Sequence, residues 1–324
     1  MRLANWAAAT DPGRRRRRNE DSYVLEPPLF AVADGMGGAQ AGEVASKLAA
    51  AAVKDGAGDV EGLIQEANRR VHQRSLEDPS ASGMGTTLTV ASVEDGNVLI
   101  GHVGDSRAYL VRDGSLEQLT EDHSLVGELM RSGKLSVEEA EQHPQRSMIT
   151  RALGTDPDVD VDVFPIEPRA GDLFLLCSDG LTTMVGDREI LALVEEKRGD
   201  LQALVKALIK AANKGGGEDN ITVVAFELDD AAEDGSELDE TAVVAGDPDE
   251  EDTLTEADEV PVVPPPADDT MVVSADELAA AYEQEQAVAA PRRRRRLLWR
   301  LASFLLAVAL LIAIAFVVLW GLTQ

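Results

Sequence analysis

The sequence LFAVADG at residues 29–35 joins a run of five apolar residues to an aspartate and a glycine. A short apolar run that ends at such a turn signal is typical of a buried β-strand. Residues 173–178 form a second, mostly apolar run, which precedes Asp179-Gly180. Most Asp-Gly pairs are simple turns, but Asp34 and Asp179 each follow a strand that is predicted to be fully buried.

Further short apolar segments and several helical patterns surround these two strands. Strands are predicted at residues 86–92, 98–103, 107–111 and 220–226, and helices at 41–53, 60–77 and 200–212. Clusters of antiparallel strands with helices inserted as pairs favour stacked sheets that helices cover, which is an α+β fold. Residues 120–150 are predicted to be an insertion, helical near 125–132 and 136–142, that could act as a flap beside a site.

Two more aspartates lie at the ends of predicted strands. Asp219 comes just before the apolar residues 221–226, and Asp105 interrupts a strand region beside Gly104. In an antiparallel sheet the end of one strand and the start of its neighbour fall on the same edge, so three carboxylates are expected to meet at one rim. Carboxylates that converge raise one another's pKa unless a cation offsets their charge.

The chemistry of such a rim depends on its ligands. A site rich in oxygen and without His or Cys suits Mg²⁺ or Mn²⁺, and Gly35 would let the backbone approach the ion. Two such ions can hold a bridging hydroxide that attacks phosphorus in line. The five arginines at residues 14–18 could then hold the phosphate. The pattern alone leaves two interpretations open, a metal-dependent hydrolase and a set of structural turns.

The 324 residues divide into parts of unlike composition. We expect a globular catalytic domain at residues 1–228, a disordered acidic linker at 229–291 and a basic juxtamembrane segment at 292–300. Of the net charge of −29, 21 acids lie in residues 229–290, where there is no Lys or Arg, and six arginines follow them, which leaves −14 for the first domain. This balance argues against nucleic acid as a partner, because a nucleic-acid-binding protein normally presents a basic face.

The uncharged residues 301–320 indicate a transmembrane helix, because 20 helical residues rise about 30 Å, the thickness of a hydrocarbon core. Trp299 and Trp320 flank the segment as interfacial aromatics do, and a buried core helix or a surface helix is disfavoured because the segment has no polar face. The preceding arginines favour a cytoplasmic catalytic domain, with residues 321–324 beyond the bilayer. We therefore expect a single-pass protein of the cell (inner) membrane.

Eight short motifs occur in a fixed order along the first domain. They are NEDS at 19–22, ADGMGG at 33–38, AGEVAS at 41–46, GMGTT at 83–87, GDSRAYL at 104–110, HPQRSMITRALG at 143–154, CSDGL at 177–181 and GGEDNITVV at 216–224. In this order they resemble the bacterial metal-dependent protein phosphatases of type 2C. With the C-terminal anchor, the layout is similar to that of the phosphatase partners of bacterial transmembrane Ser/Thr kinases.

The resemblance implies a central antiparallel β-sandwich flanked by helices on both sides, a four-layer αββα arrangement. It also implies a binuclear Mn²⁺ or Mg²⁺ site. Asp34 would bridge the two ions, the Gly35 carbonyl would bind the second, and Asp179 with Asp219 would complete the first. Asp105 and Asp179 would hold a third, weaker ion. The implied activity is hydrolysis of phosphoserine and phosphothreonine on proteins, among them a membrane Ser/Thr kinase and its targets.

The remaining roles come from the same resemblance. Glu20 and Asp21 would act on the ions largely through water, and Arg16 occupies the phosphate-binding position. Some relatives carry a His after the Asp-Gly pair as general acid, whereas this chain has Met36. His143 is then the best side-chain candidate for the proton donor, although a His before Pro in a loop is more often structural.

Other interpretations of the first domain stay open at this stage. An inactive scaffold that recognises phosphate would be expected to have lost one of the acids, and the acid set is intact. A phosphatase of small phosphate esters would share the same site, so the sequence does not separate it from a protein phosphatase. The acidic linker could also fold back on the arginines at 14–18 and compete with substrate.

Overall fold

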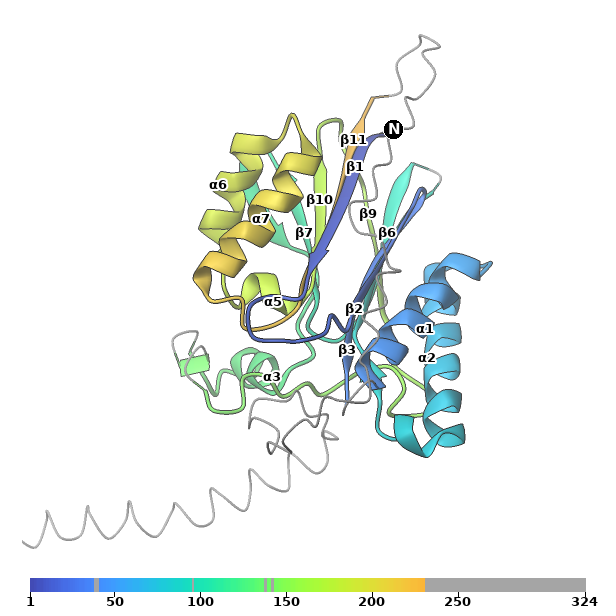
Figure 1. Ribbon diagram of the computed structural model, residues 1–324. Helices are drawn as coiled ribbons and strands as arrows, with labels where there is room; N and C mark the ends of the chain where they lie inside the picture. Colours follow the sequence, from blue (N-terminus) through green and yellow to red (C-terminus); the bar gives the residue numbers. More distant parts are fainter. Residues whose placement is uncertain (38–40, 95, 137–138, 141–142, 231–324) are drawn as a thin grey trace, which may run out of the picture. The chain divides into compact units, whose positions relative to one another are not determined.

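The computed structural model describes residues 1–37, 41–94, 96–136, 139–140 and 143–230. Two antiparallel sheets stack face to face in this part of the chain (Figure 1). The first has the order β1-β11-β10-β7-β8, from β1 (Arg2–Asp11), β7 (Arg107–Arg112), β8 (Ser115–Gln118), β10 (Leu173–Cys177) and β11 (Ile221–Asp229). The second has the order β2-β3-β5-β6-β9, from β2 (Asp21–Glu26), β3 (Leu29–Met36), β5 (Leu88–Glu94), β6 (Asn97–Val103) and β9 (Asp162–Ile166), and β4 (Gly85–Thr86) pairs with β3.

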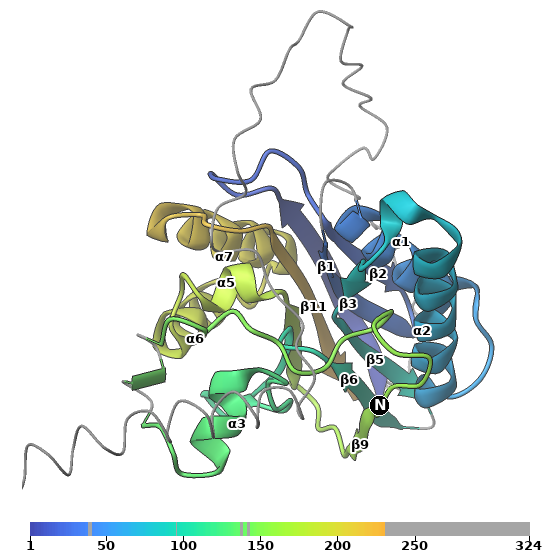
Figure 2. The same cartoon turned by 90° about the horizontal axis from the view of Figure 1, so that it is seen from below.

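Helices cover both outer faces of the sandwich, as the side view (Figure 1) and the view from below (Figure 2) both show. The face of the second sheet carries α1 (Ala41–Asp55) and α2 (Val60–Glu77), and the face of the first carries α5 (Asp179–Thr182), α6 (Asp187–Lys197) and α7 (Leu201–Gly215). Asp59 and Asp200 start α2 and α7 by accepting hydrogen bonds from the backbone N–H groups of Gly62 and Ala203, both at 2.9 Å. The predicted α+β class and four-layer order are confirmed.

Three apolar layers hold the sheets and helices together. The middle layer lies between the sheets, where the ring of Phe226 stacks on Phe30 with centroids 4.3 Å apart and on Phe174 at 5.0 Å. The outer layers join each sheet to its helices, for example Val90 of β5 to Ile64 of α2. Alternation along each strand thus supplies an apolar side chain to both faces, which explains why the strands appear in the sequence as almost continuous apolar runs.

Some elements were not predicted from the sequence. Strands β1, β2, β8 and β9 and helices α5 and α6 have no counterpart in the prediction, whereas the predicted strands and the predicted helices at 41–53, 60–77 and 200–212 are present with small changes at their ends. The predicted flap contains α3 (Leu125–Arg131), and η1 (Pro79–Ala81) follows α2. The second predicted flap helix, residues 136–142, lies partly outside the described residues.

The predictions for the C-terminal part concern residues that the structure does not describe. The linker from residue 231 on, the basic segment and the predicted span at 301–320 all lie outside the described residues. Within the described ranges, no helix has the length and apolar character needed to cross a membrane.

Candidate active site

Four of the predicted aspartates come together at one end of the sandwich. Asp34 lies in β3, Asp179 is the first residue of α5 directly after β10, and Asp219 stands two residues before β11. Asp105 lies in the turn between β6 and β7. The expectation of a single sheet rim is wrong in one respect, because Asp34 lies in a strand of the second sheet, while Asp179 and Asp219 lie beside the ends of β10 and β11 in the first. The acids therefore meet across the open end between two stacked sheets.

The carboxylates of this cluster repel one another. Desolvation raises the pKa of Asp34 well above its usual range, and the charges of Asp21, Asp179 and Asp219 raise it further. Desolvation, and then the charge of Asp219, raise the pKa of Asp179 to about 6. A hydrogen bond from Asp34 lowers the pKa of Asp179 and so offsets part of this rise. The pKa of Asp105 is also raised well above its usual range, first by desolvation and then by Asp179. A divalent cation would remove this repulsion.

Asp21 closes the inner side of the cluster. It is 8% exposed, and its Oδ2 accepts hydrogen bonds from Ser178 Oγ at 2.8 Å and Thr222 Oγ1 at 2.6 Å. Desolvation raises the pKa of Asp21 to about 7 in spite of these two hydrogen bonds. Ser178 precedes α5, and because its hydroxyl is directed to Asp21 it makes no capping hydrogen bond to that helix.

The donor set fits a hard divalent cation. Asp21 Oδ1 and Asp179 Oδ1 are buried oxygens without a hydrogen-bond partner in the described part of the chain, and such oxygens are expected to have one. Carboxylate oxygens are the ligands that Mg²⁺ and Mn²⁺ prefer. The described residues contain no group of three or more His, Cys, Asp or Glu side chains already arranged to hold an ion. The aspartates are thus gathered at the site, but their carboxylates are not yet arranged in the geometry of a bound ion.

The backbone beside Asp34 is held firmly. Its N–H donates to Thr87 Oγ1 at 3.0 Å, and its carbonyl accepts from Thr86 Oγ1 at 2.8 Å. The next residue, Gly35, has no room for a side chain, because a Cβ there would lie 2.1 Å from the carbonyl oxygen of Gly42 and 2.6 Å from that of Glu20. A glycine is therefore required for the close approach of β3 to the start of α1.

Glu20 lies beside the close contact between β3 and the start of α1. Its backbone carbonyl accepts a hydrogen bond from the Gly35 N–H at 3.2 Å. A Cβ on Gly42, in the first turn of α1, would lie 2.7 Å from Glu20 Oε2. The Glu20 carboxylate thus stands at the positive end of a helix, where a negative charge is stabilised. Asp21 lies in the cluster and Glu20 lies beside Gly35 and Gly42, and the predicted action of both on the ions through water stays a prediction.

Arg16 reaches the cluster from the loop between β1 and β2. Its Nη2 donates to Asp219 Oδ2 at 2.9 Å, and about a third of each side chain is exposed. The loop is braced by Asn220, whose Nδ2 donates to the carbonyls of Pro12 at 3.0 Å and Arg18 at 2.8 Å. The Asn220 Oδ1 accepts from the Glu20 N–H at 2.7 Å. Sequence reasoning gave Asn220 no role of its own, although it directly follows Asp219.

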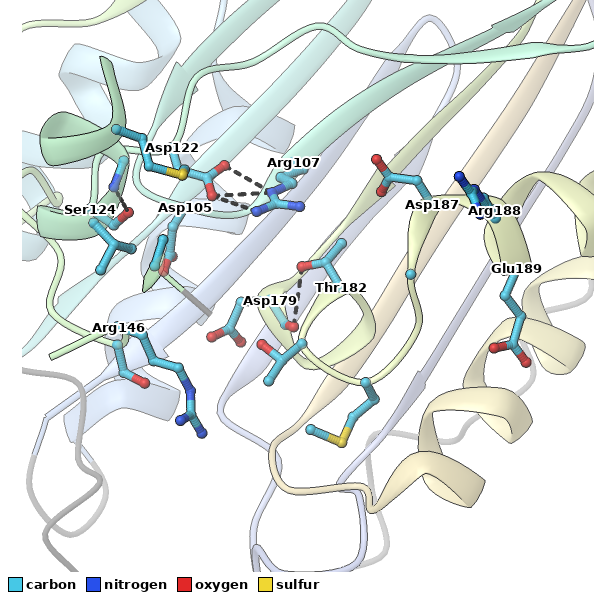
Figure 3. A pocket seen from close by; sticks show the side chains of 18 residues that line it. Asp105, Arg107, Asp122, Ser124, Arg146, Asp179, Thr182, Asp187, Arg188 and Glu189 are labelled. Carbon is cyan, nitrogen blue, oxygen red and sulfur yellow. Dashed lines mark hydrogen bonds and ion pairs between the residues drawn. The ribbon is translucent and has the colours of Figure 1, made fainter. Parts of the chain in front are cut away.

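A groove of about 960 Å³ runs outward from Asp105 and Asp179 (Figure 3). One side is formed by the flap segment, including Ser124 and Arg146, and the other by the corner of α5 and α6, including Arg188. Two of its lining residues, Arg107 and Asp122, form a two-pronged ion pair, with Nη2 to Oδ2 at 2.6 Å and Nε to Oδ1 at 2.9 Å. The volume of the groove lies within the range of ligand-binding sites.

His143 makes local contacts. Its Nδ1 accepts a hydrogen bond from the Gln145 N–H at 3.2 Å, and its carbonyl accepts from the Arg146 N–H at 3.2 Å. These contacts describe a turn, so a role of His143 as proton donor stays a prediction. Met36 is 6% exposed and packs with Ile149 of the flap segment and with Ala152 just after it, so it is a packing residue.

His102, His72 and the single Cys have structural surroundings. His102 is fully buried, with Nδ1 2.9 Å from Thr89 Oγ1 and Nε2 3.2 Å from the Glu121 carbonyl. His72 Nδ1 lies 3.1 Å from the Gly154 carbonyl. Cys177 is buried, and desolvation raises the pKa of its thiol to about 12, which makes it a poor nucleophile.

Comparison with known proteins agrees with this geometry. A model of the protein phosphatase 2C family matches residues 17–221. The serine/threonine phosphatase stp of Listeria monocytogenes serotype 4b is 43% identical over 238 residues, which cover 68% of this chain and 94% of the relative. The serine/threonine protein phosphatase PstP of Mycobacterium tuberculosis is 40% identical over 237 residues, 70% of this chain and 46% of the relative.

Solved structures show the same fold. The crystal structure of the Mycobacterium tuberculosis serine/threonine phosphatase PstP/Ppp matches with a TM-score of 0.66 at 40% identity, over 70% of this chain and 100% of that one. The catalytic domain of PstP in complex with two manganese ions matches with a TM-score of 0.64 at 37% identity, over 70% and 99% of the two chains. The chain therefore belongs to the protein phosphatase 2C family and is a metal-dependent protein serine/threonine phosphatase.

Proposed function

We propose that this chain removes phosphate from phosphoserine and phosphothreonine on proteins and so reverses Ser/Thr kinase signalling at a membrane. The observation that carries the hydrolytic part is the cluster of Asp34, Asp179 and Asp219, whose acids repel one another. Two carboxylate oxygens at this cluster are buried without a partner among the described residues. Such an arrangement is costly unless cations complete it.

In this proposal two Mn²⁺ or Mg²⁺ ions would be held by Asp34, the Gly35 carbonyl, Asp179 and Asp219, and Asp34 would be shared between them as the resemblance implies. When bound, such ions activate water as a nucleophile near neutral pH and offset the charge of the phosphate. Asp105 and Asp179 would hold a third ion at the mouth of the groove.

Arg16 would orient the phosphate. Its guanidinium is held at the edge of the cluster by Asp219 and is still partly exposed, so it can donate to a phosphate oxygen without leaving the rim. The proton for the leaving oxygen does not come from position 36, where a buried Met stands. It would come from water or from another donor, of which His143 remains the side-chain candidate.

The membrane part of the proposal rests on the sequence. The uncharged segment 301–320 would anchor the chain, and the linker would let the domain reach substrates around its anchor, roughly 40–45 Å away for a flexible segment of about 60 residues. Its partners would be the bilayer, a membrane Ser/Thr kinase and the targets of that kinase. Fractionation of cells that express the full chain tests this part, because removal of 301–320 should move the protein from the membrane to the soluble fraction.

Hydrolysis is tested with the full chain on a phosphothreonine peptide in Mn²⁺. Wild-type activity should disappear in EDTA, and Asp34→Asn and Asp179→Asn should each lower kcat/KM by at least about 100-fold. Asp113→Asn is the matched control, because this aspartate is 85% exposed in a turn away from the cluster. Full activity of both site variants would contradict the proposed site, and peptide binding without turnover would favour a scaffold.

A further inference from the structure

The loop between β1 and β2 carries five consecutive arginines, of which the proposed mechanism uses only Arg16. Residues 1–228 have a net charge of −14, so this run is a concentrated positive segment on an acidic domain. Arg16 is half-buried and the other four arginines are exposed. In Figure 1 the loop, in dark blue, passes below α5 at the end of the sandwich where the aspartates meet.

The structure holds this loop in place at both ends. The Asn220 amide donates to the carbonyls of Pro12 and Arg18, 3.0 and 2.8 Å away. The Gly217 carbonyl accepts from the N–H groups of Arg14 at 2.7 Å and Arg15 at 3.2 Å. Neighbouring like charges would separate in a flexible loop, whereas these contacts keep them together beside the strand that follows Asp219.

Two of the five arginines, Arg14 and Arg17, have no acidic partner within the described residues. Arg16 pairs with Asp219 at 2.9 Å, and Arg15 lies 3.3 Å from Glu218 in an exposed pair. In the described ranges, no carboxylate forms an ion pair with the guanidinium of Arg14 or Arg17. These two side chains therefore present charge to solvent on either side of the phosphate-binding position.

The spacing sets what could bind there. Arg14 and Arg17 lie within two residues of Arg16, so their Cα atoms are at most about 8 Å from its own. An extended peptide advances about 3.3 Å per residue. If Arg16 holds the phosphate, residues about two to four positions from the phosphorylated one would lie opposite the other arginines. Carboxylates or a second phosphate at those positions would pair with them.

We propose that Arg14 and Arg17, with Arg15 and Arg18 beside them, select substrates whose phosphothreonine or phosphoserine is flanked by acidic residues. This inference rests on the proposed function and names its substrate class. An exposed ion pair changes binding by about two- to fivefold, so the two unpaired arginines together should change kcat/KM by about four- to twenty-fivefold. The preference should weaken at high salt, because exposed charges are screened.

The test compares two phosphothreonine peptides that differ only in their flanks, one with Glu and Asp at positions two to four on both sides, the other with Gln and Asn. The full chain is assayed in Mn²⁺ at low salt, as wild type and as the double variant Arg14→Gln/Arg17→Gln. The control double variant is Arg69→Gln/Arg169→Gln, which removes the same charge from α2 and from the loop before β10. An Arg14→Lys/Arg17→Lys variant keeps the charge.

Wild type should prefer the acidic peptide, and this preference should fall about four- to twenty-fivefold in the Arg14→Gln/Arg17→Gln variant. The control and the Lys variant should keep the preference, and kcat/KM for the Gln/Asn peptide should stay within about twofold in all of them. An unchanged preference in the Gln variant would overturn the proposal, as would an equal loss in the control. Increased activity on both peptides would also overturn it, because the chain's own acidic segment would then be the ligand of the loop. Failure of the proposed function itself is distinguishable, since wild type would then hydrolyse neither peptide.

Discussion

Asp21 and Asp34 lie directly opposite one another on the paired strands β2 and β3. Side chains of directly opposed residues share one face of a sheet, and like charges in such a pair are destabilising. Both carboxyls have raised pKa values, first because of desolvation. This pair therefore destabilises the metal-free folded chain, as expected at a site where a cation is to be bound.

Replacement of Asp34 by Asn should stabilise the chain in the absence of metal. At pH 8 the free energy of unfolding in EDTA should rise by about 1–3 kcal/mol, because a charge is removed from among other charges. Addition of Mn²⁺ should raise the Tm of wild type and have little effect on the variant. Denaturant unfolding with and without Mn²⁺ measures both effects. A less stable Asp34→Asn chain in EDTA would contradict this account, and Asp113→Asn should change neither quantity.

Asp21 should make the free energy of unfolding of the metal-free chain depend on pH. Its folded pKa of about 7 lies above the ordinary 3.8, so between these values the folded metal-free chain holds a proton that the unfolded chain has lost. Its contribution to stability is therefore greatest below about pH 4 and falls as the pH rises to about 7. In EDTA, the stability of Asp21→Asn relative to wild type should increase across this window. A difference that stays constant from pH 4 to 7.5 would show that the Asp21 pKa is not raised.

His102 should act in the opposite direction. Desolvation lowers its pKa from 6.5 to about 3, so the folded chain keeps it neutral while the unfolded chain takes up a proton below pH 6.5. The contribution of His102 to stability is fully present above pH 6.5 and is lost as the pH falls toward 3. His102→Gln, which can still bond to Thr89 and Glu121, should flatten the loss of stability between pH 6.5 and 4. Equal slopes for variant and wild type would contradict the prediction.

The sequence predicted the parts of the fold whose signal is local. Strands β3, β10 and β11 appear as apolar runs because both of their faces are covered. In contrast, β1 is rich in Ala and polar residues, and β9 contains Pro165 and alternates between half-buried and exposed side chains. Both depend on pairing with distant strands, β1 with β11 and β9 with β6.

The site follows the same rule. The four aspartates could be found because each stands beside a strand end in the sequence. That Asp34 belongs to the opposite sheet could not be found, since strand order depends on the whole fold. The brace from Asn220 to Arg18 joins residues 202 positions apart, and no local pattern indicates it.

Asn220→Ala should separate the loop from the cluster. The variant loses the hydrogen bonds to Pro12, Arg18 and Glu20, so it should lower stability by about 1–3 kcal/mol and let Arg16 move. KM for a phosphothreonine peptide should rise by about 10-fold or more, because the phosphate ligand is no longer positioned. Asn213→Ala is the matched control, since Asn213 Nδ2 donates to Asp11 Oδ1 at 3.1 Å and makes none of the hydrogen bonds to Pro12, Arg18 or Glu20. An unchanged KM in Asn220→Ala would show that Arg16 is positioned without the brace.

Met36→His tests whether the missing general acid can be restored at the position where some relatives carry His. Met36 is 6% exposed and packs against Ile149 and Ala152, so an imidazole there would be desolvated and its pKa lowered. A neutral ring is a poor acid near pH 7.

We expect the Met36→His variant to lose about 1–3 kcal/mol of stability and to gain no activity on phosphothreonine peptides between pH 6 and 8. Met36→Leu should keep wild-type activity and stability within about 1.5 kcal/mol. A rise in kcat of Met36→His with a new acidic limb in its pH profile would contradict this expectation, because the position would then face the leaving oxygen.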